Sequence, residues 1–161
     1  YLDPTDESMY AGHQFLNKKD LLMRPNGHST GMACVFYVME SVYRLGHEPA
    51  LTLRNAKSID ILSRSPKGNH YEISVKAIHG GGKWGIGKKD EDYSNRKNLV
   101  FVLLHYKQFK DLSELPIVRV IPAPIAQNIK RDWQYTQSAL HLYKADQLEM
   151  EDYINAWDYL D

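Results

Sequence analysis

Two alternating segments around a turn-forming cluster most constrain how this chain can fold. Residues 58–64 and 70–77 each alternate apolar and polar side chains, and residues 65–69, Ser-Pro-Lys-Gly-Asn, lie between them. This pattern predicts a β-hairpin with a loop of several residues. If the hairpin is centred on the middle residue of that loop, Asp60 lies opposite Ser74, and this pair sets the register of both strands.

The two faces of this predicted hairpin differ in chemistry, because successive side chains of a strand point to opposite sides. The apolar face would carry Ile59, Ile61, Tyr71, Ile73 and Val75. The polar face would carry Asp60, Glu72, Ser74 and Lys76. The hairpin therefore predicts a sheet with a core on one side and an acid and a lysine close together on the other.

The composition is that of a water-soluble globular domain with no overall charge. The 161 residues are 43% hydrophobic and 25% charged, and 20 basic residues balance 20 acidic ones. Net charge therefore gives no argument for nucleic-acid binding. Residues 67–97 hold seven basic residues against four acids, and residues 144–161 hold six acids and one base. That separation fits a polyanion site in the middle of the chain, and it equally fits random surface charge.

The single cysteine and the hydropathy of the chain exclude several classes of protein. Cys34 has no partner for an internal disulfide, and one cysteine excludes a multi-cysteine zinc site. We expect it to be a buried packing residue. No stretch reaches transmembrane length, and no secretory signal peptide is visible in the printed sequence, so the expected compartment is the cytoplasm.

The order of predicted elements places the chain in the α/β class. Residues 1–30 are predicted to form a polar arm with a short helix at 10–23, and residues 31–161 to form the core domain. Within the core we expect a helix at 31–45, strands at 49–53, 98–106, 115–122 and 135–142 besides the hairpin, a charged loop at 79–98, and helices at 124–130 and 148–160. The expected architecture is a mixed central β-sheet flanked by helices.

Asp60 and Lys76 are the candidate catalytic residues of the hairpin. Hydrolysis of a phosphodiester needs a metal ion held by carboxylates, an activated water, and a cation near the developing charge. Asp60 stands between two isoleucines, an unfavourable place for a solvated acid without a function. The alternatives are that Asp60 bonds to a neighbouring turn or pairs with Lys76, and that Lys76 protects a sheet edge from aggregation.

The second carboxylate of such a site is replaced by Ser74. A serine hydroxyl is a weak ligand for a hard cation compared with a carboxylate. Glu72 shares the face but lies two residues away, a displacement of about 6–7 Å along a strand, which makes it a weak candidate metal ligand. Glu40, the one acid of the predicted first helix, lies off its apolar stripe and is expected to face solvent.

The glycine-rich segment after the hairpin supplies candidate nucleic-acid contacts. Lys83, Lys88 and Lys89 could form a basic lip over the polar face of the hairpin, and Trp84 could stack on a base. The alternative for Trp84 is packing on the glycines of its own loop.

These pieces together resemble the PD-(D/E)XK nuclease superfamily, which has the restriction-endonuclease-like fold, and they look most similar to its small bacterial members. The resemblance covers about residues 30–161 and depends on the order and spacing of its parts. Those parts include Ala50–Leu62, Ile73-Ser74-Val75-Lys76-Ala77, Asn98–Leu104 and Asn155–Leu160. By resemblance, Asp60 would be the metal-binding acid and Lys76 the catalytic lysine. Members usually carry Glu, Asp or Gln where this chain has Ser74, and many have a glutamate in the first helix that is absent here.

Three functions follow from this resemblance and its departures. The first is a degenerate member that associates with nucleic acid, DNA being the implied partner, without cleaving it. The second is an active Mg²⁺- or Mn²⁺-dependent DNA endonuclease, a metal-dependent phosphodiesterase that uses Asp60 and Lys76. The third is a protein-binding module. A homodimer is also implied, with Trp157 either in its interface or docking the last helix onto the domain.

Overall fold

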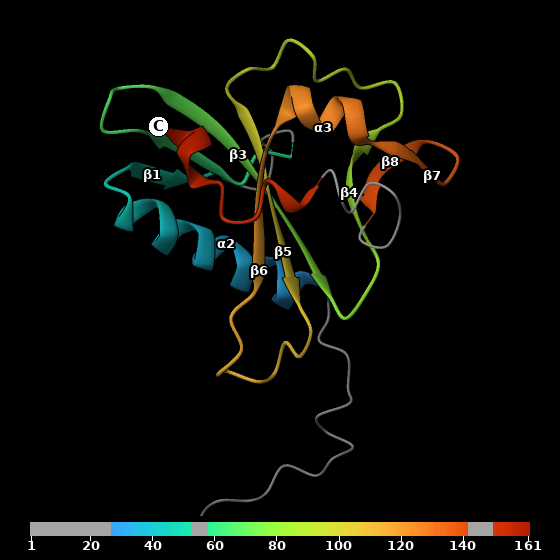
Figure 1. Ribbon diagram of the computed structural model, residues 1–161, viewed down its shortest axis with the longest axis horizontal. Coiled ribbons are helices and arrows are strands. Elements are labelled where there is room, and N and C mark those ends of the chain that lie inside the picture. The colour runs from blue at the N-terminus through green and yellow to red at the C-terminus, as the bar shows by residue number, and fades with distance from the viewer. Residues whose placement is uncertain (1–26, 53–57, 142–149) are drawn as a thin grey trace, which may run out of the picture.

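The computed structural model describes residues 27–52, 58–141 and 150–161, and it forms a mixed α/β fold with two sheets (Figure 1). The predicted short helix at 10–23 lies outside the described residues. The elements are α2 Gly27–Arg44, β1 Glu48–Leu51, β2 Ile61–Arg64, β3 His70–His79, β4 Lys83–Lys88, β5 Leu99–Tyr106, β6 Ile117–Pro122, α3 Ala123–Ile129, β7 Arg131–Trp133, β8 Gln137–His141 and the 3₁₀ helix η2 Trp157–Leu160.

Helix α2 confirms the predicted first helix and begins four residues earlier than expected. Its buried side chains recur at helical spacing and face the larger sheet: Thr30, Cys34, Val35, Val38 and Val42. The helix ends at Arg44, and the turn after it contains Gly46, whose φ of 81° is a conformation that glycine adopts without steric cost. The amide N–H of Gly46 bonds to the carbonyl of Tyr43, and that of His47 to the carbonyl of Val42.

The larger sheet has the order β1-β2-β3-β5-β6 and confirms the predicted hairpin. β2 and β3 pair antiparallel with Ile61 opposite Ile73, the register expected from a loop centred on its middle residue. β5 pairs parallel to β3 and antiparallel to β6, so the sheet is mixed. Seven of the eight residues of β5 are buried, as its continuous apolar sequence predicts for a central strand.

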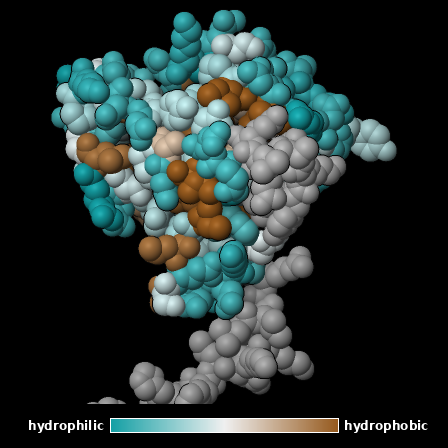
Figure 2. Space-filling view, viewed as in Figure 1, coloured by the Kyte–Doolittle hydropathy of each residue, from teal (hydrophilic) through white to brown (hydrophobic). Residues whose placement is uncertain are grey.

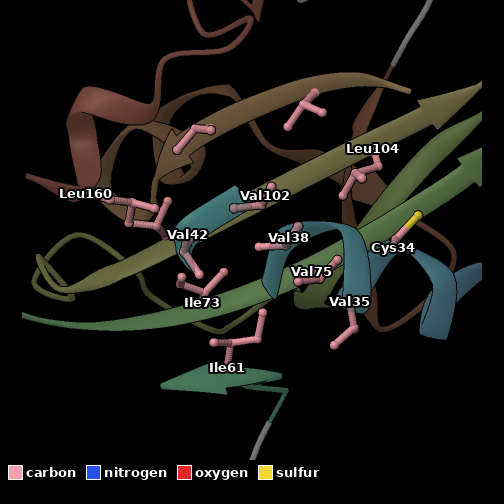
Figure 3. Close-up of a cluster of buried hydrophobic side chains, with 13 residues drawn as sticks. Cys34, Val35, Val38, Val42, Ile61, Ile73, Val75, Val102, Leu104 and Leu160 are labelled. Atoms are coloured by element: carbon pink, nitrogen blue, oxygen red, sulfur yellow. The ribbon is translucent and has the colours of Figure 1, made fainter. Parts of the chain in front are cut away.

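β5 divides the interior into two hydrophobic clusters. Val100, Val102 and Leu104 pack with α2 in the first cluster, where Figure 3 shows Val102 and Leu104 facing Val38 and Cys34. Leu99, Phe101 and Leu103 belong to the second cluster, which lies under β4, β8 and α3. Each face of the central strand is therefore covered, one by α2 and the other by the smaller sheet and α3 (Figure 1).

The smaller sheet corrects the prediction that 79–98 is a loop. β4 pairs antiparallel with β8, and β8 with β7, in the order β4-β8-β7. In β4, Trp84 and Ile86 are buried in the second cluster, while Gly85 on the other face lies against the ring of Trp133. Glycine is depleted in strands. The Gly and Lys residues around the two buried apolar positions therefore made the sequence pattern typical of a loop.

The predicted terminal helix at 148–160 is wrong over most of its described part, in which only residues 150 and 151 are α-helical. Residues 152–156 are not helical, and only the four residues of η2 form a 3₁₀ helix. The reason is that this segment pairs with the backbone N–H and C=O groups at the open edge of β6. The N–H of Val120 bonds to the carbonyl of Tyr153, and the N–H of Asn155 bonds to the carbonyl of Val118. Asn155 has a φ of 52°, which interrupts a helix.

Trp157 packs against the first hydrophobic cluster, which agrees with the prediction that it docks the end of the chain. Among the described residues, no helix has the length and apolar character needed to cross a membrane.

Candidate functional site at the β2–β3 hairpin

Asp60 lies one residue before β2 and is hydrogen-bonded to β3 through both its backbone and its side chain. Its amide N–H donates to the carbonyl of Ile73 at 2.9 Å, and its Oδ2 accepts the amide N–H of Val75 at 2.7 Å. Its carbonyl accepts the N–H of Thr52 at 3.0 Å. These bonds hold the carboxylate over the middle of β3, where the predicted register placed it.

Burial governs the electrostatics of Asp60. It raises the pKa of the carboxyl group above its usual 3.8, while the hydrogen bond from Val75 and the positive charge of Lys76 lower the pKa by less. The effect of Lys76 shows that the two predicted catalytic residues are close enough to interact. A desolvated carboxylate beside a lysine is an arrangement more frequent at functional sites than elsewhere.

Ser74 is buried at the position where the second carboxylate would be needed. Its side chain is 1% exposed, and its Oγ has no hydrogen-bond partner among the described residues. A cavity of about 10 Å³ borders it, lined by Ile59, Ile86, Tyr93 and Phe101 among others. That volume holds one water molecule at most.

Glu72 lies on the same face and is engaged elsewhere. Its Oε2 accepts a hydrogen bond from Arg96 Nη2 at 2.6 Å, and Arg96 Nη1 also lies 3.8 Å from Glu91 Oε1. Sequence reasoning missed Arg96, because its partner is 24 positions away and no local pattern marks the pair. Glu72 as a weak metal ligand would require this ion pair to break.

A metal ion does not fit these residues as they stand. Among the described residues, no group of three or more His, Cys, Asp or Glu side chains is placed to hold a metal ion. Ser74 carries no charge, Glu72 is paired with Arg96, and Glu91, which also lines the cavity beside Ser74, lies 3.8 Å from Arg96. Mg²⁺ is usually held by one or two protein carboxylates together with its waters and substrate phosphates. The number of carboxylates available here is therefore at the lower limit of that range.

The four predicted nucleic-acid contacts divide into three kinds. Trp84 is 1% exposed and its indole N–H bonds to the carbonyl of Leu104 at 3.1 Å, so the prediction that it stacks on a base is wrong. Lys89 forms an ion pair with Asp132 at 3.0 Å. Lys83 lies over the ring of Trp133, with 5.4 Å between Nζ and the ring centroid. Lys88 is exposed.

Lys88 connects the smaller sheet to the hairpin through a surface hollow. The hollow has a volume of about 450 Å³ and is lined by Ser58, Lys88, Asp90 and Glu91. Ser58 is two residues from Asp60, so the hollow adjoins the candidate site. Its charge is mixed, because two acids accompany the one lysine.

Comparison with known proteins gives distant structural similarity and no match in sequence. No family model matches the chain, and no curated protein shows significant similarity to it. The solved structure of a bacterial homing endonuclease, I-Ssp6803I, superposes with a TM-score of 0.49 and 15% sequence identity, covering 84% of this chain and 91% of that one.

Proposed function

We propose that this protein is a PD-(D/E)XK nuclease-like protein that binds nucleic acid without cleaving it. The observation that supports this most directly is the trio at the hairpin: Asp60 is bonded to Val75 of β3, the charge of Lys76 acts on the Asp60 pKa, and a buried serine stands two residues before that lysine. The arrangement keeps the acid and the lysine of a phosphodiesterase and lacks its second acid.

The loss of that acid argues against cleavage. A two-carboxylate site holds the metal that activates water and stabilises the leaving oxygen. Here Ser74 Oγ is buried under Tyr93 and Ile86, and Glu72 is committed to Arg96. Of the two carboxylates predicted as ligands, only Asp60 is not committed to Arg96, which should reduce metal affinity severely.

Local charge supports association with nucleic acid. The chain has no net charge, yet the strands of the smaller sheet carry Lys83, Lys88 and Arg131 against one acid, Asp132, which is paired with Lys89. Cations grouped in this way attract a phosphate backbone although the whole chain is neutral. This sheet adjoins the candidate site through the hollow at Lys88 and Ser58.

Two measurements on the full chain test the proposal. Calorimetric titration of Mn²⁺ and Mg²⁺ should show no tight binding to the wild type or to Asp60→Ala, and labelled oligonucleotides should bind with an affinity that falls as salt rises. Divalent-metal-dependent cleavage that is abolished by Asp60→Ala would instead establish the active endonuclease. Absence of any oligonucleotide binding would favour the protein-binding module.

A further inference from the structure

We propose that the outward face of the β4–β8–β7 sheet, together with the tip of its β7–β8 hairpin, binds single-stranded nucleic acid. This inference rests on the function proposed above and names the strand type and the surface. We call this surface the basic sheet face and define it by Lys83, Lys88, Arg131, Trp133 and Gln137, with Tyr135 at the hairpin tip.

The strand register places these side chains on one face. Trp133 pairs with Gln137, and Gln137 pairs with Lys88. Paired residues of antiparallel strands project to the same side of a sheet. The opposite side carries Trp84 and Leu140, which are both buried in the second hydrophobic cluster. The basic sheet face therefore points away from the core.

Trp133 is seated on this face by a glycine that leaves room for it. A Cβ at Gly85 would lie 2.9 Å from Cζ3 of Trp133, closer than real contacts allow. On the same face, Lys83 Nζ lies 5.4 Å from the centroid of the Trp133 ring, a cation–π distance. The indole thus fixes the hairpin to β4 and holds a positive charge beside it.

Tyr135 projects into solvent at the hairpin tip. Its side chain is 98% exposed, and the preceding Gln134 has a φ of 59°, which turns the chain sharply. Figures 1 and 2 show the β7–β8 hairpin at the side of the molecule, where the surrounding surface is mostly hydrophilic. An aromatic ring in this position can stack on an unpaired base, which presents a bare π-face, whereas the bases of a duplex are already stacked on one another.

Charge complementarity identifies the partner as a polyanion. Lys88 and Arg131 are exposed, and the acid among the three strands, Asp132, is paired with Lys89 at 3.0 Å. Cations that track a phosphate backbone beside an aromatic side chain that stacks on bases are the usual combination in single-strand binders.

Fluorescence anisotropy with a labelled oligothymidylate and a duplex of equal length tests this surface. The single strand should bind more tightly than the duplex, and Tyr135→Ala should weaken its binding about 5- to 150-fold, the loss of one stacked base. The double variant Lys88→Gln/Arg131→Gln should reduce the steepness with which the logarithm of the binding constant falls with the logarithm of salt concentration, by about 1.4. Tyr43→Ala is the matched control, because Tyr43 is 58% exposed on α2, which covers the other face of the central sheet.

The possible results separate this inference from the proposed function. Wild-type binding of the single strand that Tyr135→Ala leaves unchanged would overturn the surface assigned here and leave the proposed function standing. Tighter binding of the duplex would likewise overturn it. If the wild type bound neither probe, both proposals would fall. Since Tyr135 is almost fully exposed, its substitution should not unfold the chain, and circular dichroism checks that directly.

Discussion

Single residues decide whether the polar face of the β2–β3 hairpin can perform chemistry. Asp60 was predicted to lie opposite Ser74; the observed register pairs Ile61 with Ile73, and Asp60, one residue before β2, bonds to Ile73 and Val75 on either side of Ser74. That register was predictable, because it follows from the turn residues and from alternation along one short segment. The ion pair between Glu72 and Arg96 was not predictable, because it joins two segments that only the folded chain brings together.

The free energy of unfolding should increase when Asp60 is replaced by asparagine at neutral pH. Burial raises the pKa of Asp60 above 3.8, so keeping it ionised costs folding free energy at every pH above its folded-state pKa. The amide of the substituted side chain would keep an oxygen to accept the N–H of Val75 without that cost. Urea denaturation at a series of pH values should show the advantage of Asp60→Asn shrinking as pH falls toward about 4.

A less stable Asp60→Asn variant at neutral pH would show instead that the attraction of Lys76 and the Val75 hydrogen bond outweigh burial. In the wild type, stability should fall as pH rises through the folded-state pKa of Asp60, because the folded chain binds the proton more tightly than the unfolded one there.

Ser74→Asp should restore a second acid and with it metal-dependent stability. Two carboxylates at one site repel each other, so without metal this variant should be less stable than the wild type. On addition of Mn²⁺, its melting temperature should rise more than that of the wild type. Ser74→Ala is the control: removing a buried hydroxyl with no partner among the described residues should change stability by less than about 1 kcal/mol. A Mn²⁺ response equal in Ser74→Asp and wild type would count against the proposed position of the lost acid.

At the scale of elements, the sequence predicted strand β8 of the smaller sheet and missed strands β4 and β7. The segment after β3 was predicted to be a charged loop, and it forms β4, whose Trp84 turns into the core. Glycine at alternate positions usually signals irregular backbone. Here Gly85 serves a different purpose, because the ring of Trp133, from a strand far along the chain, occupies the space a side chain would fill. No pattern within the segment could have indicated that contact.

Gly85→Ala should therefore destabilise the fold by about 1–3 kcal/mol, the cost of forcing an extra methyl group into a packed site. The added Cβ would lie 2.9 Å from Trp133 Cζ3, so the indole and the β7–β8 hairpin must shift. Urea denaturation measures the change.

Gly31→Ala provides the comparison, because no atom lies within 4 Å of a Cβ at Gly31 in α2. This change should stabilise the protein by about 0.5–1 kcal/mol, the usual advantage of alanine over glycine inside a helix. Equal effects of the two substitutions would contradict the seating of Trp133 on β4.

At the scale of the whole molecule, β5 joins the two hydrophobic clusters into one folding unit. Leu104 contributes to the cluster under α2, and Leu103 to the cluster under the smaller sheet. Both side chains are fully buried although they are adjacent in the sequence. A strand that is covered on both faces couples the two sides of the sheet, so neither cluster should unfold alone.

Leu103→Ala and Leu104→Ala should each lower the free energy of unfolding by about 2–5 kcal/mol, and each should shift one common transition. Tryptophan fluorescence and circular dichroism followed in parallel during urea denaturation check this. Leu112→Ala, at a side chain that is 97% exposed, should change stability by less than about 0.5 kcal/mol. Separate transitions for the two probes would show that the clusters unfold independently.

The homodimer implied by the sequence stays a prediction, which light scattering coupled to gel filtration can test.

The sequence by itself determined the elements whose signals are local. These are helices α2 and α3, the β2–β3 hairpin with its register, and the strands β1, β5, β6 and β8. Periodicity and turn chemistry act within a few residues, so they can be read from the chain.

The tertiary structure alone decided the remainder: strands β4 and β7 and their pairing with β8, the burial of Ser74 and Trp84, the ion pair of Glu72, and the pairing of residues 153–155 with β6. Each of these depends on which distant segment fills a space or satisfies a hydrogen bond, and packing of that kind overrides local propensity.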